Sequence, residues 1–241
     1  MKRTLLWMTL MAVAPLACAE GDAGWKGEGE LGLALSRGNS ETESLNGKVG
    51  LSFEDARWKH ALGFSALRQK GESGNTGDLE LTANRYELSG SSGYKFSERA
   101  YVIGTLRYEN DDFAPYEYQA IGSLGLGWYA IKNETTEWLF EGGPGYRRYR
   151  EVATGQTDGQ GVFRGVMGYK HVLTETTSLE NELLVEAGSD NTYAQNDTGL
   201  VVKMNAKLAL KAGLQFRHNS DVAPGLKKTD SLFTTNLVYS F

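Results

Sequence analysis

Apolar and polar residues alternate with a period of two along most of the chain after residue 24. In one such segment Val49, Leu51 and Phe53 alternate with Lys48 and Ser52. A period of two places successive side chains on opposite faces of a strand, whereas an amphipathic helix needs apolar residues three or four positions apart. The pattern therefore predicts strands with one apolar face and one polar face.

Clusters of Gly, Asn, Asp and Ser divide the alternating sequence into twelve segments, which we predict to be strands connected as sequential hairpins. They cover residues 25–36, 41–53, 58–70, 79–95, 100–110, 116–131, 138–149, 160–173, 178–188, 197–206, 208–219 and 230–241. Alternate connections are short and the others longer and more polar, as in outer-membrane barrels. We therefore predict an all-β fold, an antiparallel transmembrane up-and-down β-barrel of 12 strands, formed by a single domain over residues 20–241.

A soluble lipocalin-like barrel or β-sandwich would also alternate with a period of two, and the period alone does not exclude it. The charged face favours a membrane barrel, as do aromatic residues near strand ends, among them Trp58, Tyr101 and Tyr129, which suit an interfacial belt. The last strand ends in the alternating aromatic residues Tyr239 and Phe241. We interpret these two as a signal for the outer-membrane assembly machinery.

The first 19 residues have the three parts of a secretory signal peptide. Lys2 and Arg3 precede the apolar run 5–16, and the small residues Ala17 and Ala19 predict cleavage after Ala19. A lipoprotein signal acylated at Cys18 is the alternative, which Pro15 disfavours because a Leu-like residue is expected there. Cleavage removes the only cysteine of the chain.

The expected mature chain is acidic, because loss of two leader residues leaves 23 basic against 30 acidic side chains and moves the net charge from −5 to −7. This charge and the lack of a basic cluster exclude nucleic acid as a partner. The expected partners are outer-membrane lipids, lipopolysaccharide and the assembly machinery. We expect no cofactor, metal site or catalytic residue, since His60, His171 and His218 fall on the outward phase and no segment has calcium-loop spacing.

Charges of both signs fall on the inward phase of the predicted strands. The candidate lumen residues are Lys26, Glu28, Glu30, Lys48, Arg85, Glu87, Arg107, Glu141, Arg147, Glu180, Glu182 and Glu186, and Glu117 shares their phase. Balanced charge predicts a narrow lumen with paired side chains, and a salt-bridged structural interior is as compatible with it as a transport path.

Two further motifs carry a structural or a chemical signal. The run from Gly142 to Gly145 contains Pro144, and proline cannot donate to a strand ladder, so we expect a β-bulge there. His218, Asn219 and Ser220 are residue types of an outer-membrane phospholipase site. Their adjacency in a strand points them to alternating faces, which makes this signal for a lipid hydrolase weak.

The run Gly29-Glu30-Leu31-Gly32-Leu33, the segments 36–42 and 110–116, the Gly142–Tyr146 motif and the C-terminal Leu237–Phe241 resemble the YdiY-like family of salt-induced outer-membrane proteins. The resemblance covers nearly the whole mature chain. It implies a monomeric barrel in the outer membrane of a Gram-negative bacterium, with a link to salt stress and no known catalytic residues. The leading hypothesis is thus a non-enzymatic barrel of envelope or salt-stress type; a small solute channel and a lipid hydrolase are the alternatives.

Overall fold

The computed structural model describes residues 24–36, 42–72, 78–222 and 227–241, and the predicted leader lies outside these ranges. The strands are β1 (Trp25–Ser36), β2 (Thr42–Glu54), β3 (Trp58–Glu72), β4 (Leu79–Lys95), β5 (Ala100–Asp111), β6 (Tyr116–Lys132), β7 (Thr136–Glu151), β8 (Thr157–Val172), β9 (Thr177–Gly188), β10 (Thr192–Lys203), β11 (Leu208–Asn219) and β12 (Thr229–Ser240). Within the described ranges, no helix is long and apolar enough to cross a membrane.

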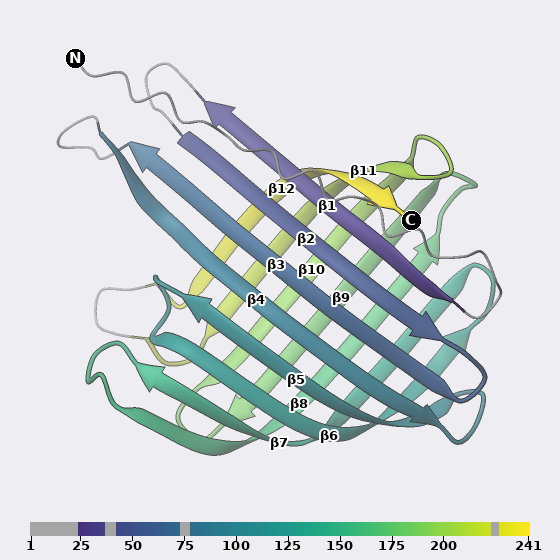
Figure 1. The fold of residues 1–241 in the computed structure, drawn as a ribbon, viewed down its shortest axis with the longest axis horizontal. Helices are drawn as coiled ribbons and strands as arrows, with labels where there is room; N and C mark the ends of the chain where they lie inside the picture. The colour runs from purple at the N-terminus through teal and green to yellow at the C-terminus, as the bar shows by residue number, and fades with distance from the viewer. Residues whose placement is uncertain (1–23, 37–41, 73–77, 223–226) are drawn as a thin grey trace.

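Each strand pairs with its sequence neighbours in antiparallel register, and β1 pairs with β12, which closes the barrel (Figure 1). The predicted all-β architecture of twelve strands is therefore confirmed for the described part of the chain. We call the end with the connections β1–β2, β3–β4 and onwards the loop end. The end with the connections β2–β3, β4–β5 and onwards is the turn end.

Apolar side chains cover the outside of the barrel, and charged side chains fill its inside. Leu106, Leu124 and Phe233 are 70–72% exposed on the outer surface, whereas Arg147 and Glu186 are fully buried in the lumen. A soluble barrel requires the opposite arrangement, because its apolar faces must leave water. The alternation thus has the polarity that a lipid-facing wall requires.

The five connections at the turn end share one hydrogen-bonding pattern. A side-chain oxygen at the first or second loop position accepts hydrogen bonds from the backbone N–H groups two and three residues later. The accepting residues are Asp55, Ser97, Asn133, Thr174 and Asn205. At Asp55, the bonds from Trp58 and Arg57 hold the pKa of the carboxyl below its usual range.

Outward aromatic rings gather near the turn end. The Trp58 ring lies 5.6 Å from the His60 ring and 5.2 Å from the Tyr94 ring. His171 stacks on Tyr169 in the same way, so these histidines belong to the interfacial belt that their strand phase predicts. The prediction of an outer aromatic belt was wrong for Tyr101 and Tyr129, whose side chains lie in the lumen.

Strand β10 begins five residues earlier than the sequence suggested, at Thr192 rather than at residue 197. The segment 192–196 is polar enough to suit a loop. In a barrel with a polar lumen, however, inward positions are polar too: Tyr193 is 1% exposed, and its hydroxyl donates to Gln195. Polarity in this fold therefore does not distinguish a loop from an inward strand position.

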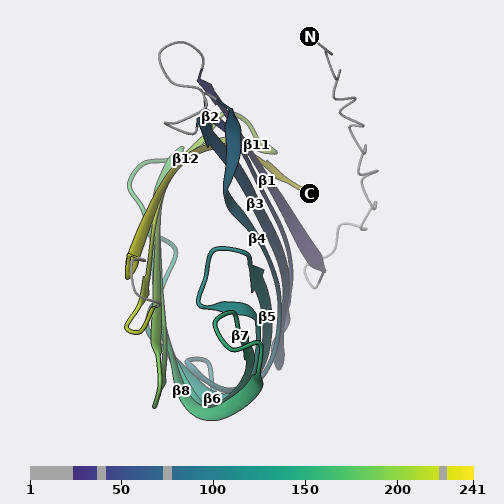
Figure 2. The ribbon, with the colours of Figure 1, turned by 90° about the vertical axis from the view of Figure 1, so that its left-hand side faces the viewer.

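The expected bulge at Gly142–Gly145 is absent from the described strand. The β7–β8 register is continuous there, and the β6–β7 register is the same on both sides of Pro144. The glycines instead allow β6 and β7 to approach closely, since a Cβ on Gly143 would lie 2.1 Å from the backbone oxygen of Leu124. The wall turns sharply through β6–β8, the curved lower end in Figure 2.

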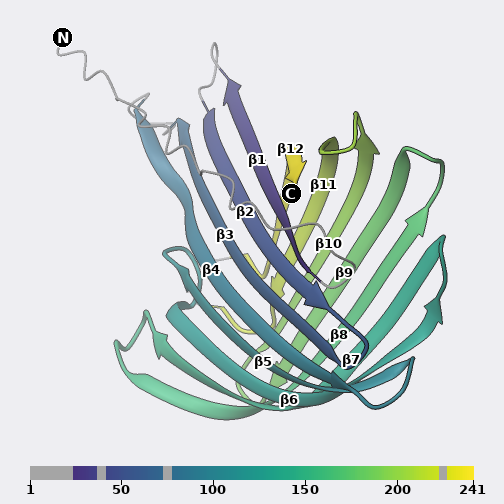
Figure 3. The ribbon, with the colours of Figure 1, turned by 45° about the vertical axis from the view of Figure 1, so that its right-hand side comes forward.

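A bulge does occur in β6, between Tyr116 and Tyr118. It changes the phase of the strand, so Glu117 is exposed and forms an outer ion pair at 3.2 Å with Arg150 instead of facing the lumen. At the other side of the barrel, β1–β4 extend beyond β5 and β6 at the loop end (Figure 3). The rim of the loop end is consequently slanted.

Candidate functional site in the barrel lumen

A buried ionic network occupies the loop end of the lumen next to β5. The Arg107 guanidinium contacts both carboxylate oxygens of Glu186 through Nε and Nη2. Its Nη1 donates to Glu109 at 2.8 Å and to Glu87 at 3.1 Å. Residues from β4, β5 and β9 are thereby joined across the interior.

A second arginine shares the central carboxylate of this network. Arg217 Nη2 lies 2.7 Å from Glu109, and its Nη1 lies 2.7 Å from Asp111. Its Nε donates to the Tyr193 hydroxyl at 2.8 Å, and both arginines lie over the Tyr193 ring. The shared Glu109 carboxylate, together with the carboxylates that contact only one arginine, compensates the charge of two buried guanidinium groups.

Tyrosine and aliphatic side chains fill the lumen at the turn end of β5–β7. Tyr101 and Tyr129 are 0% and 1% exposed and pack with Ile103. The Tyr101 hydroxyl donates to Glu141 at 2.7 Å, and Lys59 donates to the Tyr129 hydroxyl at 3.0 Å. These two tyrosines are therefore lumen residues, contrary to the prediction that they belong to the outer belt.

The rest of the lumen contains two cavities, which are bordered mainly by β1–β4 and β9–β12 and also by residues of β7, β8 and the β5–β6 connection. The turn-side cavity has a volume of about 510 Å³, and the loop-side cavity about 440 Å³. Four residues line both cavities: Leu67, Arg85, Gln215 and Leu232. The two cavities therefore meet at these four side chains.

One hydrogen bond crosses the lumen where the cavities meet. Arg85 Nη2 on β4 donates to Gln215 Oε1 on β11 at 2.7 Å. The two strands belong to the front and rear walls of the barrel in Figure 1. Gln215 is itself fixed, because its Nε2 donates to Asp197 at 2.6 Å. We call the Arg85–Gln215 contact, with Leu67 and Leu232 beside it, the lumen constriction.

Charge is unequal around the turn-side cavity, in contrast to the balanced lumen that the sequence predicted. Among the described residues that line it, seven are acidic and four are basic. The acidic residues are Glu28, Glu30, Glu87, Glu137, Glu180, Glu182 and Asp197, and the basic residues are Lys48, Arg85, Lys170 and Lys211. The balance predicted for the whole lumen therefore does not extend to this cavity.

The structure divides the candidate lumen charges among these regions. Arg107, Glu186 and Glu87 form the network; Arg147 lies beside it and donates to the backbone oxygens of Glu186 and Asn191. Glu28, Glu30, Lys48, Arg85, Glu180 and Glu182 line the turn-side cavity, Glu141 bonds Tyr101, and Lys26 is exposed near the turn end of β1.

Sequence reasoning missed uncharged residues of the site, above all Gln215, Asn46 and Asn236. Asn46 donates to Asn236 at 3.0 Å, and Asn236 donates to Glu30 at 2.9 Å. Their inward strand phase was the available signal, but the pattern of charged residues does not include them. Each of these amides can donate and accept hydrogen bonds, so it connects groups on different strands without adding net charge.

The residues of the suggested hydrolase motif bond to other partners. His218 Nδ1 lies 2.8 Å from the Thr229 hydroxyl on the outer face. Ser220 instead donates to Asn191 Oδ1 at 3.2 Å and accepts the Thr192 N–H. The geometry of this segment thus gives the hydrolase alternative no support.

A closed twelve-strand barrel with an apolar outer wall and a charged lumen defines the class of outer-membrane β-barrels. Within that class, the chain belongs to the DUF481 family, proteins of unknown function, whose sequence profile matches residues 29–241. No curated protein sequence matches the chain.

Among the solved structures that are similar in fold are two with TM-scores of at least 0.50. One is the COG4313 outer membrane channel from Pseudomonas putida F1, with a TM-score of 0.51, 13% identity, and coverage of 95% of this chain and 98% of that chain. The other is the translocator domain of the autotransporter NalP from Neisseria meningitidis, with a TM-score of 0.50, 13% identity, and coverage of 92% and 89%. At this identity the likeness concerns the fold alone.

Proposed function

We propose that the protein is a non-enzymatic outer-membrane channel of low conductance, with a narrow lumen for small ions and small polar solutes. The observation that carries the proposal is the pair of cavities that meet at the lumen constriction. Together they extend along one side of the barrel from the turn end towards the loop end. Where only side chains close a lumen, side-chain movement alone is enough for it to conduct.

The alternative is a sealed barrel whose interior has a purely structural role, and the filled side of the lumen is consistent with it. The ionic network and the tyrosine cluster close the part of the lumen next to β5 and β6. The rest of the lumen has the Arg85–Gln215 crossing where the cavities meet. Nearer the loop end, the Arg217–Asp111 ion pair at 2.7 Å borders the loop-side cavity. A hydrogen bond between side chains exchanges readily with water, so the Arg85–Gln215 crossing favours a channel over a seal.

The charge of the turn-side cavity supports cation preference. Seven carboxylates against four basic groups give a negative lining, and lining charge sets ion selectivity in narrow pores. Glu182 is exposed to this cavity and has no ion-pair partner among the described residues. We therefore expect Glu182→Gln to lower the cation-to-anion permeability ratio, measured as a reversal potential in a salt gradient, with Glu98→Gln in an exposed turn as the control.

The main test is single-channel recording from purified protein in planar bilayers. Arg85→Ala and Gln215→Ala should each raise the conductance, because each removes one half of the crossing. Arg148→Ala removes an arginine on the exposed outer face and should leave the conductance unchanged. Silence of the wild type and of both constriction variants, all shown to be folded, would favour the sealed barrel.

The proposed setting is the outer membrane of a Gram-negative bacterium, where the protein would act as a monomer in contact with lipids and lipopolysaccharide after delivery by the assembly machinery. The apolar outer wall supports this setting. A role in salt stress rests on the sequence resemblance, and growth of a deletion strain across salt concentrations tests it. Membrane fractionation and the mass of the mature chain, expected to begin at Glu20, test the location and the leader.

A further inference from the structure

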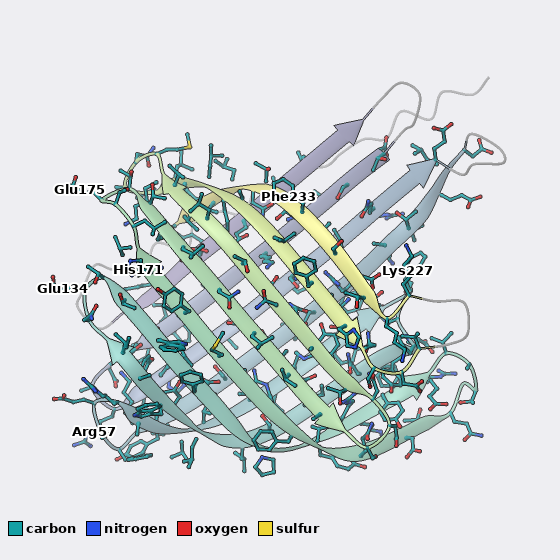
Figure 4. All side chains as sticks on the ribbon, turned by 180° about the vertical axis from the view of Figure 1, so that it is seen from behind. Arg57, Glu134, His171, Glu175, Lys227 and Phe233 are labelled. Atoms are coloured by element: carbon teal, nitrogen blue, oxygen red, sulfur yellow. The ribbon has the colours of Figure 1, made fainter. Side chains whose placement is uncertain are left out.

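The junction between β1 and β12 differs from every other junction of the barrel. Its register contains five residue pairs, from Glu28↔Ser240 to Gly32↔Asn236, whereas the other junctions contain eleven or more. Figure 4 shows β12 diverging from β1 beside Phe233. Within the described residues, the junction is thus paired near the turn end and unpaired towards the loop end.

The last pair coincides with a hydrogen-bonded clasp on the lumen side. Asn46 on β2 donates to Asn236 on β12 at 3.0 Å, and so passes over the intervening strand β1 at Gly32. A Cβ on Gly32 would lie 2.2 Å and 2.3 Å from the two amide oxygens, which explains glycine at this position. Asn236 continues the clasp to Glu30, which Lys211 contacts at 2.7 Å.

Beyond the clasp, the unpaired edges of β1 and β12 have two chemically different sides. On the outside, Leu33 of β1 is 58% exposed and Phe233 of β12 is 70% exposed. On the inside, Leu232 and Thr234 of β12 line the turn-side cavity. Phe233 lies opposite Leu214 in the β11–β12 register, and this exposed leucine places the unpaired edge in the apolar band.

We propose that this unpaired junction is a lateral portal for a membrane amphiphile, whose acyl chain occupies the junction while its head group reaches the lumen. An unpaired strand edge at the depth of the hydrocarbon is tolerated where it borders a polar cavity. The apolar chain would lie between Leu33 and Phe233, and the polar head group would face Thr234 and the cavity behind it. The portal goes beyond the proposed channel, because its route runs through the wall rather than along the axis.

Quenching by brominated lipid tests the portal directly. In a Cys18→Ser background, Thr234→Cys is labelled with a bimane fluorophore and the protein is reconstituted in vesicles of phosphatidylcholine with or without brominated acyl chains. The matched control is Ser89→Cys, which lines the same cavity from β4 but lies in a strand paired on both sides. We expect bromine to reduce fluorescence at position 234 and not at position 89.

Loss of the clasp should enlarge the effect. Asn46→Ala removes the contact that limits the opening and should increase quenching at position 234. Leu232→Cys offers a second labelling position if Thr234→Cys does not fold, as judged by heat-modifiable migration. Conductance recorded in planar bilayers from the same preparations tests the proposed channel separately from the portal.

Three results would overturn the portal. Equal fluorescence with and without bromine at position 234 would show that acyl chains do not enter. Equal quenching at positions 234 and 89 would show that lipid reaches the lumen by another route. Disulfide-linked dimers of a Leu33→Cys variant in membranes would show that a second copy covers the junction.

Discussion

Replacing Glu109 with glutamine should destabilise the barrel more than any exchange of a surface carboxylate. Glu109 is 2% exposed and accepts hydrogen bonds from Arg107 at 2.8 Å, Arg217 at 2.7 Å and Gln119 at 3.2 Å. Glutamine retains the shape but not the charge, so two buried guanidinium groups lose the carboxylate that they share. Removing one partner of a buried ion pair costs about 3–5 kcal/mol.

The lower end of that range applies here, because each arginine retains another carboxylate: Arg107 contacts Glu186, and Arg217 contacts Asp111. We therefore expect a loss of about 3 kcal/mol, which lowers the folding equilibrium constant roughly a hundredfold. Urea unfolding in lipid vesicles, followed by tryptophan fluorescence, measures this change.

The control is Glu117→Gln on the outer surface. Glu117 pairs with Arg150 at 3.2 Å with both side chains about half exposed, and such pairs contribute about 0–1 kcal/mol. Losses for Glu109→Gln and Glu117→Gln that agree within about 1 kcal/mol would refute the reasoning, because the buried network would then stabilise no more than a surface pair.

Two further predictions concern the backbone. Gly143→Ala should lower the free energy of unfolding by about 1–3 kcal/mol and reduce the yield of heat-modifiable barrel, because its Cβ would lie 2.1 Å from the Leu124 backbone oxygen. The control Gly161→Ala, whose Cβ would have no atom within 4 Å, should fold normally. Equal yields of the two variants would contradict the close approach of β6 and β7. Deleting Phe241 removes two backbone hydrogen bonds to Gly27, at 2.7 and 2.9 Å, which together contribute about 1–3 kcal/mol of stability. The deletion should therefore reduce the folded fraction in outer-membrane preparations. An undiminished fraction would argue against a role of Phe241 in assembly.

The sequence was sufficient to predict the strands because their pattern is local. A period of two can be read within a few residues, and eleven of the twelve junctions join consecutive strands. It was not sufficient to predict the contacts across the lumen. Arg85 and Gln215 are 130 positions apart, and Glu30 and Asn236 are 206 positions apart, so strand tilt and register decide whether they meet.

The errors in the prediction have a related cause. An aromatic residue near a strand end suits both the interfacial belt and the lumen. Only a strand phase that is correct to one residue places Tyr101 and Tyr129 in the lumen rather than in the belt. Pro144 indicated an irregular strand, but the neighbouring glycines accommodate a close approach of two backbones without a change of register. Both outcomes depend on a neighbouring strand that local patterns do not describe.

The capped connections at the turn end have a consequence for assembly. Each of the five fixes its hairpin through groups within three residues of one another, so these hairpins form with low contact order. Closure of the barrel is different, since it joins the first strand to the last across almost the whole described chain. The steepest entropic barrier therefore falls on the junction with the fewest pairs, and the clasp of Asn46 and Asn236 is positioned to retain the two ends once they meet.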